Sequence, residues 1–320
     1  MPPKVFSGSA NKELALAIVE TLGLKLGAVE LSRYPDGEIN VEFLETVRGH
    51  DVFIIQPICP PVNAHLMELL IMLDALKRSS PSRITSVIPY YGYSRQDRKH
   101  GPREPITAKL IADLIEVAGP QRMLFLDLHS IQIQGFFNIP ADNLSSDSLF
   151  IDYFVEKKLS GADSTIVATN AGAARRAREL AKKVGAKIAF VETRVHSGQK
   201  ILNVVGNLEK NCLLIDDMVD TGVRARDAAK VLKTNGAQKV YLWATHAILS
   251  CHADFLQNSE IDEVILTNSV PVPPSNRFAK LRIQSVAPLL AQAIKRIHEE
   301  KSISELCHRL LDREASLINE

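Results

Sequence analysis

The sequence predicts an α/β protein in which two tandem domains each carry a parallel sheet flanked by helices. Short apolar runs alternate with segments of helical periodicity along the chain, which is typical of parallel sheets covered on both faces. The length of 320 residues suits two domains that each build a full core. A strand–loop–helix–strand pattern also occurs twice, at an offset of about 156–160 residues.

The first half supplies one copy of this pattern. The apolar run at 52–55 predicts a buried strand, and a Pro-rich loop follows it. The leucines of 64–77 fall on one stripe and predict an amphipathic helix. Further buried strands are expected at 83–89 and 123–126.

The second half repeats the pattern, with a helix expected at 223–235 after a polar loop. A boundary is predicted near 143–148, where polar residues offer loop and helix-cap chemistry. We therefore expect domains at 1–145 and 146–320. The buried-strand candidates of the second half are 164–168, 187–191, 212–215, 240–244 and 263–266.

Composition excludes several classes of protein. The 38 basic and 37 acidic side chains leave a net charge of +1, which argues against binding to bulk nucleic acid or an anionic membrane. No apolar run reaches the roughly 18 residues of a membrane span, and the first residues lack a signal-peptide core. The cysteines, which are far apart without a CxxC pair, predict a reduced cytoplasmic protein with small buried thiols. They are Cys59, Cys212, Cys251 and Cys307.

The most informative segment follows the predicted strand at 212–215. Asp216 and Asp217 stand at its carboxyl end, where open α/β sheets bind ligands, and they should point to opposite sides. One acid can face the hydroxyls of a sugar while the other serves metal or scaffold. The turn at 220–222 leads backbone N–H groups into a helix, which favours a phosphate. An ordinary strand–loop–helix with an Asp cap is the alternative.

Two basic segments have competing interpretations. Arg95 and Arg98 lie in a loop after an apolar strand and can clamp polyphosphate oxygens, although such a cluster alone favours a solvated patch. The other segment is a basic helix for which a solvated face is favoured over nucleic-acid binding. Its cations are Arg175, Arg176, Arg178, Lys182 and Lys183.

Five motifs together resemble the ribose-phosphate diphosphokinases, and the similarity runs from about residue 4 to a tail near 307. The motifs are YPDGEI at 34–39, SRQDRK at 94–99, REPITAK at 103–109, DLHS at 127–130 and QIQGFF at 132–137. The resemblance implies two phosphoribosyltransferase-like domains in a homo-oligomer, a hexamer built from dimers with shared ATP sites. It implies transfer of the diphosphoryl group of Mg-ATP to the 1-hydroxyl of ribose 5-phosphate, with release of AMP, for nucleotide biosynthesis.

The same resemblance implies roles for individual residues. His129 and Arg194 are the expected catalytic residues, and His129 and Asn170 the expected magnesium contacts. Tyr34 stands where the family usually has a stacking Phe. The residues expected to hold ATP are Tyr34, Asp36, Glu38, Arg95, Gln96, Asp97, Arg98 and His129. Those expected to hold the sugar phosphate are Asp216, Asp217, Asp220, Thr221, Gly222 and Arg224.

The second half departs from the family pattern at three places that the reaction would use. Asn170 stands for a metal-associated Asp, and Glu192 or Thr193 for a lysine of a flexible catalytic loop. Val223 and Arg224 replace the Gly and Thr of the phosphate loop. Two alternatives therefore stay open beside ordinary catalysis. One is a non-catalytic nucleotide-binding homologue that regulates an active synthetase by co-assembly in a hetero-oligomer. The other is a diphosphokinase whose Arg224 meets an altered sugar phosphate.

Overall fold

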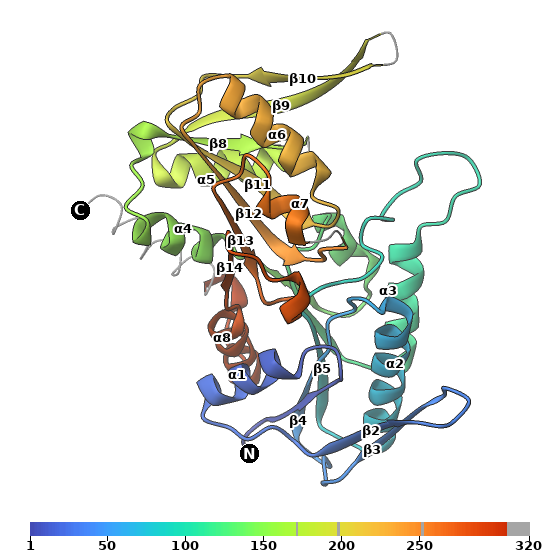
Figure 1. Cartoon of the computed structure of the whole chain (residues 1–320). Coiled ribbons are helices and arrows are strands. Elements are labelled where there is room, and N and C mark those ends of the chain that lie inside the picture. The colour runs from blue at the N-terminus through green and yellow to red at the C-terminus, as the bar shows by residue number, and fades with distance from the viewer. Residues whose placement is uncertain (171, 197–198, 251–252, 306–320) are drawn as a thin grey trace. The chain divides into compact units, whose positions relative to one another are not determined.

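The computed structural model describes residues 1–170, 172–196, 199–250 and 253–305, apart from the side chains at 193–196, 199–201 and 253 (Figure 1). Cys251 and Cys307 lie outside this description. The chain divides into two compact units, and the first boundary between them lies between Ser145 and Ser146. Residues 269–271 and 285–305 also belong to the first unit, although they follow this boundary in the sequence.

The first unit is built on a five-stranded parallel sheet in the order β1-β4-β5-β6-β7. Helices α2 and α3 lie on one side of the sheet, and α1 and α8 on the other (Figure 1). The strands are β1 (Lys4–Ser7), β4 (Asp51–Ile55), β5 (Arg83–Ile88), β6 (Arg122–Leu126) and β7 (Ala141–Leu144). The helices are α1 (Lys12–Leu22), α2 (Val62–Arg78), α3 (Thr107–Ala118), the 3-10 helix η1 (Ile131–Phe136) and α8 (Ala287–His298).

A separate antiparallel ribbon belongs to the same unit. It consists of β2 (Val29–Arg33) and β3 (Ile39–Phe43), with Leu31 opposite Val41. Figure 1 shows the turn of this ribbon projecting away from the parallel sheet. The apolar side chains of Val29, Leu31, Val41 and Phe43 alternate with polar ones and pack against the core of the first unit, so a period-two signal for both strands is present in the sequence.

Helix α8 joins the first unit because its apolar face packs against α1. Polar contacts at its end add to this packing. Asp51 accepts hydrogen bonds from Arg83 and lies 2.9 Å from His298 Nδ1, while Arg83 Nη2 donates to the carbonyl of Ile297 at 3.0 Å. The chain therefore returns to its first sheet after completing the second.

The second unit carries a seven-stranded sheet in the order β10-β9-β8-β11-β12-β13-β14. All neighbours are parallel except the β9–β10 hairpin at one edge. The strands are β8 (Ser164–Ala168), β9 (Lys187–His196), β10 (Gln199–Val205), β11 (Asn211–Val219), β12 (Lys239–Ala247), β13 (Glu263–Thr267) and β14 (Leu281–Gln284). The helices are α4 (Asp147–Glu156), α5 (Ala174–Val184), α6 (Val223–Thr234), α7 (Ala253–Gln257) and the 3-10 turns η2 (Gly161–Asp163) and η3 (Pro274–Asn276).

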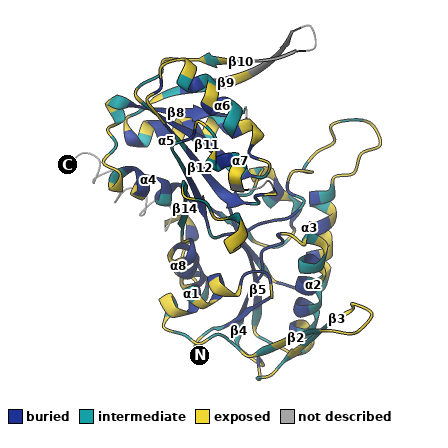
Figure 2. Ribbon diagram, viewed as in Figure 1, coloured by how far each residue is buried: buried dark blue, intermediate teal, exposed yellow. Residues whose placement is uncertain are grey.

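Two cores cover the two faces of this second sheet. Alanines and Leu232 of α6 pack on one face, while α4 and α5 pack around Trp243 on the other. Figure 2 shows the central strands buried and the outer helix faces exposed. The expected parallel sheets flanked by helices are thus confirmed, and both predicted strand–helix–strand units are present, as β4-α2-β5 and β11-α6-β12.

Among the residues that the structure describes, no helix combines the length and the apolar character needed to cross a membrane. Cys59 and Cys212 are free and buried, in agreement with the interpretation as small apolar side chains. Burial raises the pKa of the Cys59 thiol to about 12 and that of Cys212 to about 11, so both stay protonated at neutral pH.

Candidate active site

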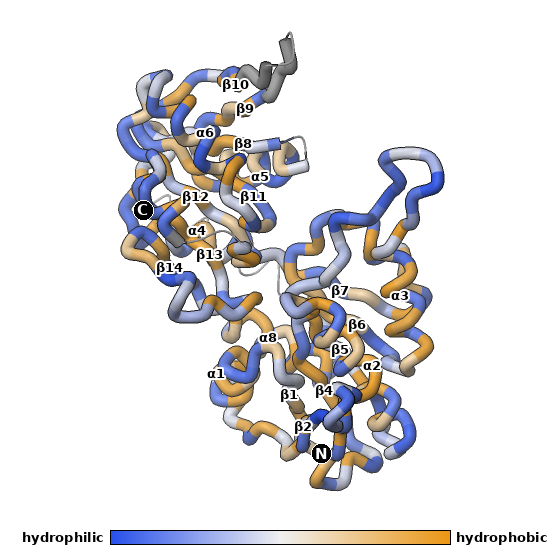
Figure 3. Tube along the Cα trace, turned by 45° about the vertical axis from the view of Figure 1, so that its right-hand side comes forward, coloured by the Kyte–Doolittle hydropathy of each residue, from blue (hydrophilic) through white to orange (hydrophobic). Residues whose placement is uncertain are grey.

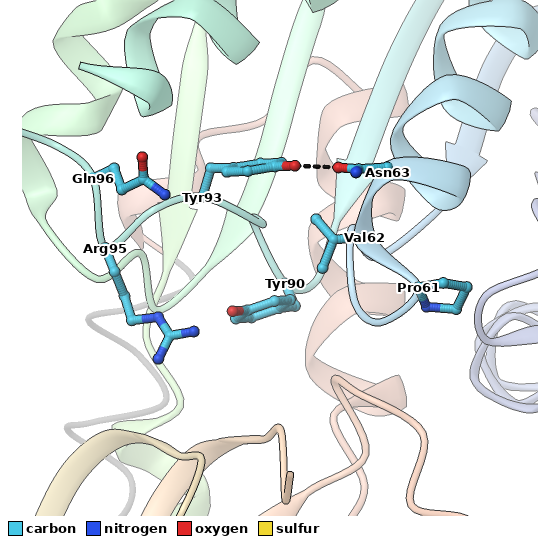
Figure 4. Close-up of a pocket in the computed structure, with 7 residues that line it drawn as sticks. All are labelled: Pro61, Val62, Asn63, Tyr90, Tyr93, Arg95 and Gln96. Carbon is cyan, nitrogen blue, oxygen red and sulfur yellow. Dashed lines mark hydrogen bonds between the residues drawn. The ribbon is translucent and has the colours of Figure 1, made fainter. Parts of the chain in front are cut away.

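The loops that follow β4 and β5 form a pocket of about 390 Å³ in the first unit (Figure 4). The Ile58 N–H donates to the carbonyl of Tyr90 at 2.8 Å and so holds the two loops together. Gly92 is required at this approach, because a Cβ there would lie 2.5 Å from the Ile58 carbonyl oxygen. The pocket is lined by Pro61, Val62, Asn63, Tyr90, Tyr93, Arg95 and Gln96.

Tyr93 organises the wall of this pocket. Its φ of +63° is unusual for a residue with a side chain, and its hydroxyl donates to Asn63 Oδ1 across the pocket. The Gln96 N–H donates to the Tyr93 carbonyl at 2.9 Å, and Thr107 Oγ1 donates to Gln96 Oε1 at 2.5 Å. These bonds connect the loop to the first turn of α3.

The structure brings only part of the expected nucleotide set to the pocket. Arg95 and Gln96 line it, whereas Asp97 and Arg98 lie farther along the same hydrophilic loop (Figure 3). His129 is exposed just beyond β6, the strand next to β5. The backbone turns there because Asp127 has a φ of +41°. His129 thus lies at the same carboxyl edge of the sheet as the pocket.

Tyr34, Asp36 and Glu38 lie in the turn of the β2–β3 ribbon and do not line the pocket. The turn is closed by its own bonds: the Tyr34 N–H donates to the Glu38 carbonyl at 2.9 Å, and the Glu38 N–H donates to Asp36 Oδ1 at 3.1 Å. The Tyr34 residue is 54% exposed. The described chain therefore presents these three side chains outward.

In the second unit, Asp216 lies inside β11 rather than after it, because β11 continues to Val219. Asp216 is 9% exposed and receives hydrogen bonds from three neighbours. Thr169 Oγ1 donates to its Oδ2 at 2.8 Å, Asn170 Nδ2 to its Oδ1 at 3.2 Å, and the Asp217 N–H to its Oδ1 at 3.0 Å. Burial, together with the neighbouring Asp217, raises the pKa of Asp216, and the Thr169 bond and Arg224 offset part of the rise.

Asn170 uses both ends of its amide within the second unit. Besides donating to Asp216, it accepts the Ala173 N–H through Oδ1 at 2.9 Å. Asn170, which is expected to contact magnesium, therefore holds the carboxylate of Asp216 and the backbone of Ala173 in this structure. Among the described residues, no group of three His, Cys, Asp or Glu side chains is arranged to hold a metal ion.

The expected phosphate turn leads directly into α6. Gly222 is the N-cap with a φ of +70°, and a Cβ there would approach Leu256 Cδ2 to 2.9 Å. Ser250 Oγ donates to Asp220 Oδ1, and Thr221, which lies between Asp220 and Gly222 in the chain, is exposed. In the first turn of the helix, Arg224 Nη1 lies 3.6 Å from Asp216 Oδ2. The turn thus collects N–H groups, a hydroxyl and a cation beside the buried carboxylate.

The stretch expected to form a flexible catalytic loop is a strand in the structure. Residues 192–194 lie in β9, where Glu192 is opposite Asn203, Thr193 opposite Leu202 and Arg194 opposite Ile201 of β10. Antiparallel pairing extends the strand beyond the predicted end at 191 because a second segment, not recognised in the sequence, pairs with it. Glu192 is exposed, and the side chains of Thr193 and Arg194 lie outside the described residues, so the role of Arg194 stays a prediction.

Sequence reasoning missed four residues that support the two sites: Thr169 and Ser250, which bind the acids, and Asn63 and Tyr93, which shape the pocket. Thr169 carries a usable signal, because a polar residue directly after an apolar strand lies at the same sheet edge as Asp216. Asn63 lies in the first turn of α2, and Tyr93 and Ser250 lie in loops, so contacts between segments far apart in the sequence bring these three to the sites.

The predicted basic helix corresponds to α5, and part of its charge is used within the second unit. Arg176 Nε donates to the buried Asp147 at 2.8 Å, and Lys183 lies 3.6 Å from the same carboxylate. Arg176 also donates to Ser146 Oγ at 2.9 Å. These two cations therefore contribute to packing between α4 and α5.

Comparison with known proteins covers nearly the whole chain. Residues 3–119 match the N-terminal domain of ribose phosphate pyrophosphokinase, and residues 193–308 match the phosphoribosyl synthetase-associated domain. A ribose-phosphate pyrophosphokinase of Thermosipho africanus is 48% identical over 95% of this chain and 96% of its own length. One of Caldanaerobacter subterraneus subsp. tengcongensis is 47% identical over 95% and 97%. The crystal structure of phosphoribosylpyrophosphate synthetase from Mycobacterium smegmatis superposes with a TM-score of 0.88 at 38% identity, covering 94% of this chain and all of that one.

Proposed function

The chain belongs to the ribose-phosphate pyrophosphokinase family, and we infer from this membership that it forms phosphoribosyl diphosphate and AMP from ATP and ribose 5-phosphate. The observation that carries the inference is 47–48% identity along 95% of the chain to relatives of that name. The activity serves nucleotide biosynthesis. In the reaction, the 1-hydroxyl oxygen of the sugar bonds to the β-phosphorus of ATP. The bond from that phosphorus to the α,β-bridging oxygen breaks, AMP leaves with the oxygen, and the hydroxyl proton is released.

We propose that the pocket of the first unit receives ATP. Its lining by Arg95 and Gln96 supports this assignment, because a guanidinium can bind two phosphate oxygens and an amide can accept and donate at the base. Tyr90 and Tyr93 add aromatic surface beside these polar groups. Asp97, Arg98 and His129 are proposed as further contacts from the same sheet edge.

We propose that Asp217, with the turn at 220–222, binds ribose 5-phosphate. The turn offers backbone N–H groups and the positive end of a helix dipole to the 5-phosphate. Asp217 is partly exposed, whereas Asp216 is buried, so Asp217 is the better placed to accept hydrogen bonds from the sugar hydroxyls. Asp216 then acts by positioning the loop after β8 and the first turn of α6.

Magnesium is proposed as the cofactor, bound mainly through ATP phosphates with His129 beside them. Mg²⁺ usually keeps waters and substrate phosphates as ligands, so it needs no cage made only of protein. When bound, it neutralises charge on the transferring diphosphoryl group. Asn170 fits this ion poorly, because both ends of its amide have partners in the protein.

A homo-oligomer is also proposed, with a hexamer built from dimers as its expected form. Two features support it: the outward-facing Tyr34, Asp36 and Glu38 of the β2–β3 turn, and exposed apolar residues along one stripe of α3. The stripe consists of Leu110, Leu114 and Val117. Light scattering after size-exclusion chromatography should report a multiple of the 35.3 kDa chain, and a monomer at working concentration would contradict the proposal. A cytoplasmic location stays a prediction.

The proposed activity is tested by incubating purified protein with Mg-ATP and ribose 5-phosphate and measuring AMP. AMP that forms only when both substrates are present supports the proposal. No AMP, with ATP still bound, would contradict it. No AMP from this protein alone, together with a changed rate of AMP release by an active homologue when this protein is added, would identify a co-assembling regulator. AMP release only with another sugar phosphate would identify an altered substrate.

A further inference from the structure

The carboxylate of Asp216 has one contact that differs from the others. Three hydrogen bonds, from Thr169, Asn170 and the Asp217 N–H, lie between 2.8 and 3.2 Å and come from groups on or beside the sheet. The fourth contact is Arg224 Nη1 at 3.6 Å, which exceeds hydrogen-bond distance. Asp216 therefore keeps a full set of close donors if Arg224 moves away.

Arg224 is placed so that it can move. Its side chain is 62% exposed, against 12% for that of Asp216, and an exposed ion pair holds its partners weakly. Among the described residues, Asp216 is its one ion-pair partner. The guanidinium has five N–H donors in a planar fork that suits phosphate oxygens.

The neighbouring arginine of the same helix provides a contrast. Arg226 donates to Asp227 through Nε and Nη2, at 2.9 and 2.7 Å. Its guanidinium also lies 4.5 Å from the centre of the Phe255 ring. Arg226 is therefore held by two hydrogen bonds and a ring contact, while the ion pair of Arg224 with Asp216 has a distance of 3.6 Å.

The carboxylates around the turn at 220–222 would disfavour phosphate binding unless a cation offset their charge. Asp216, Asp217 and Asp220 lie within five positions, and three carboxylates would repel an incoming phosphate dianion. The positive end of α6 offsets part of this repulsion. Arg224 is the second residue of that helix, so it is the cation nearest to the turn in sequence.

We propose that Arg224 is an exchangeable cation that determines specificity for a phosphorylated sugar. It pairs with Asp216 in the free protein and transfers to the 5-phosphate when ribose 5-phosphate binds, while Thr169 and Asn170 keep Asp216 in place. The proposal rests on the proposed function, because it takes the turn at 220–222 as the phosphate site.

The test is a calorimetric titration of ribose 5-phosphate into wild-type protein, Arg224→Gln, Asp216→Asn and the double variant. Loss of one charge-assisted contact should weaken binding of Arg224→Gln by about tenfold or more. In the Asp216→Asn background, Arg224→Gln should weaken ribose 5-phosphate binding by a further factor of about two to five. The reason is that Arg224 then breaks no ion pair with Asp216 when it binds the phosphate. Arg224→Lys should recover part of the affinity, and Arg226→Gln, the matched control, should bind like wild type.

Several outcomes would overturn the exchange. Equal affinity of wild type and Arg224→Gln would do so even if Asp216→Asn failed to fold. A loss that disappears in the Asp216→Asn background would show that Arg224 acts only by holding Asp216. Failure of wild type to bind ribose 5-phosphate would overturn the exchange and the proposed function together. Binding with the predicted pattern but no AMP formation would overturn the proposed function alone. ATP titration of every variant checks that the first unit is intact.

Discussion

The structure describes the surroundings of three residues that are expected to differ from the family pattern. Asn170 and Arg224 both contact the carboxylate of Asp216, whereas Glu192 lies exposed on β9. Two departures that are far apart in the sequence thus meet at one side chain. We interpret Asn170 and Arg224 as a connected adaptation around Asp216, and Glu192 as an independent one.

Replacement of Asn170 by Asp, the acid that the family resemblance leads us to expect here, should destabilise the protein in the absence of magnesium. The amide that donates to Asp216 would become a second carboxylate at about the same position. An unpaired buried acceptor costs about 1–3 kcal/mol, and like-charge repulsion adds to it. Urea denaturation measures the loss. Asn170→Ser, which keeps a donor, is the control, and equal stability of wild type and Asn170→Asp would contradict the interpretation.

Replacement of Glu192 by Lys should increase the rate of AMP formation. A cation on the transferring diphosphoryl group contributes roughly 10²–10³ in rate by analogy with other charge-stabilising donors. Steady-state kinetics of Glu192→Lys and of Glu192→Gln separate the gain of a positive charge from the loss of a negative one. If the two variants have the same kcat, the family's lysine does not correspond to position 192.

At the scale of elements, the turn from β11 into α6 depends on a glycine for two physical reasons. Gly222 has a left-handed backbone, and a Cβ at this position would lie 2.9 Å from Leu256 Cδ2 of α7. The second reason cannot be read from the sequence, because α7 is more than thirty positions away. The turn geometry is therefore partly local and partly imposed by packing.

Gly222→Ala should lower stability by about 1–3 kcal/mol, through backbone strain and the contact with Leu256. Gly236→Ala is a matched control, since Gly236 also has a positive φ but nothing lies within 4 Å of the position that a Cβ would take there. Thermal denaturation should place Gly222→Ala below Gly236→Ala. An equal loss of stability in the two variants would show that the Leu256 side chain accommodates the added methyl group without destabilising the protein.

The junction of α6, β12 and β13 depends on ionised Asp262. Lys233 Nζ at 2.7 Å, the Val240 N–H at 2.9 Å and Lys239 Nζ at 2.9 Å donate to its carboxylate. Burial alone would raise the pKa of Asp262, but these bonds outweigh it and lower the pKa below its ordinary value. Asp262 thus favours the folded state whenever it is ionised.

The contribution of Asp262 to the free energy of unfolding should therefore be fully present above the ordinary carboxyl pKa of about 3.9. It should be lost as pH falls through the lower pKa that Asp262 has in the folded state. Asp262→Asn removes this dependence. The difference in melting temperature between wild type and Asp262→Asn should be largest near neutral pH and shrink below about pH 4. A difference that stays constant with pH would show that the carboxylate charge is unimportant at this junction.

At the scale of the whole molecule, the first unit contains segments from both before and after the second unit in the sequence. Helix α8, which follows the second sheet in sequence, buries its apolar side chains in the first unit. Burial of a Leu or Ile side chain contributes about 1.5–3 kcal/mol, and a domain's total stability is only about 5–15 kcal/mol. The four larger aliphatic residues on the buried face are Leu289, Leu290, Ile294 and Ile297.

A fragment of residues 1–145 should therefore unfold without cooperativity or aggregate. The same fragment joined by a flexible linker to residues 285–305 should unfold cooperatively, because α8 again covers α1. Circular dichroism during urea titration compares the two. Cooperative unfolding of 1–145 alone at the same midpoint would contradict the assignment of α8 to the first unit.

The sequence by itself determined the α/β class, the central strands of both sheets and the paired acids of β11. These features follow from local apolar runs and from the rule that parallel strands present ligand sites at their carboxyl ends. Only the tertiary structure decided that β9 pairs with β10, that α8 joins the first unit, and that Asn170 and Arg224 both contact Asp216. Those facts depend on contacts between segments far apart in the chain, which no local pattern of hydrophobicity or charge encodes.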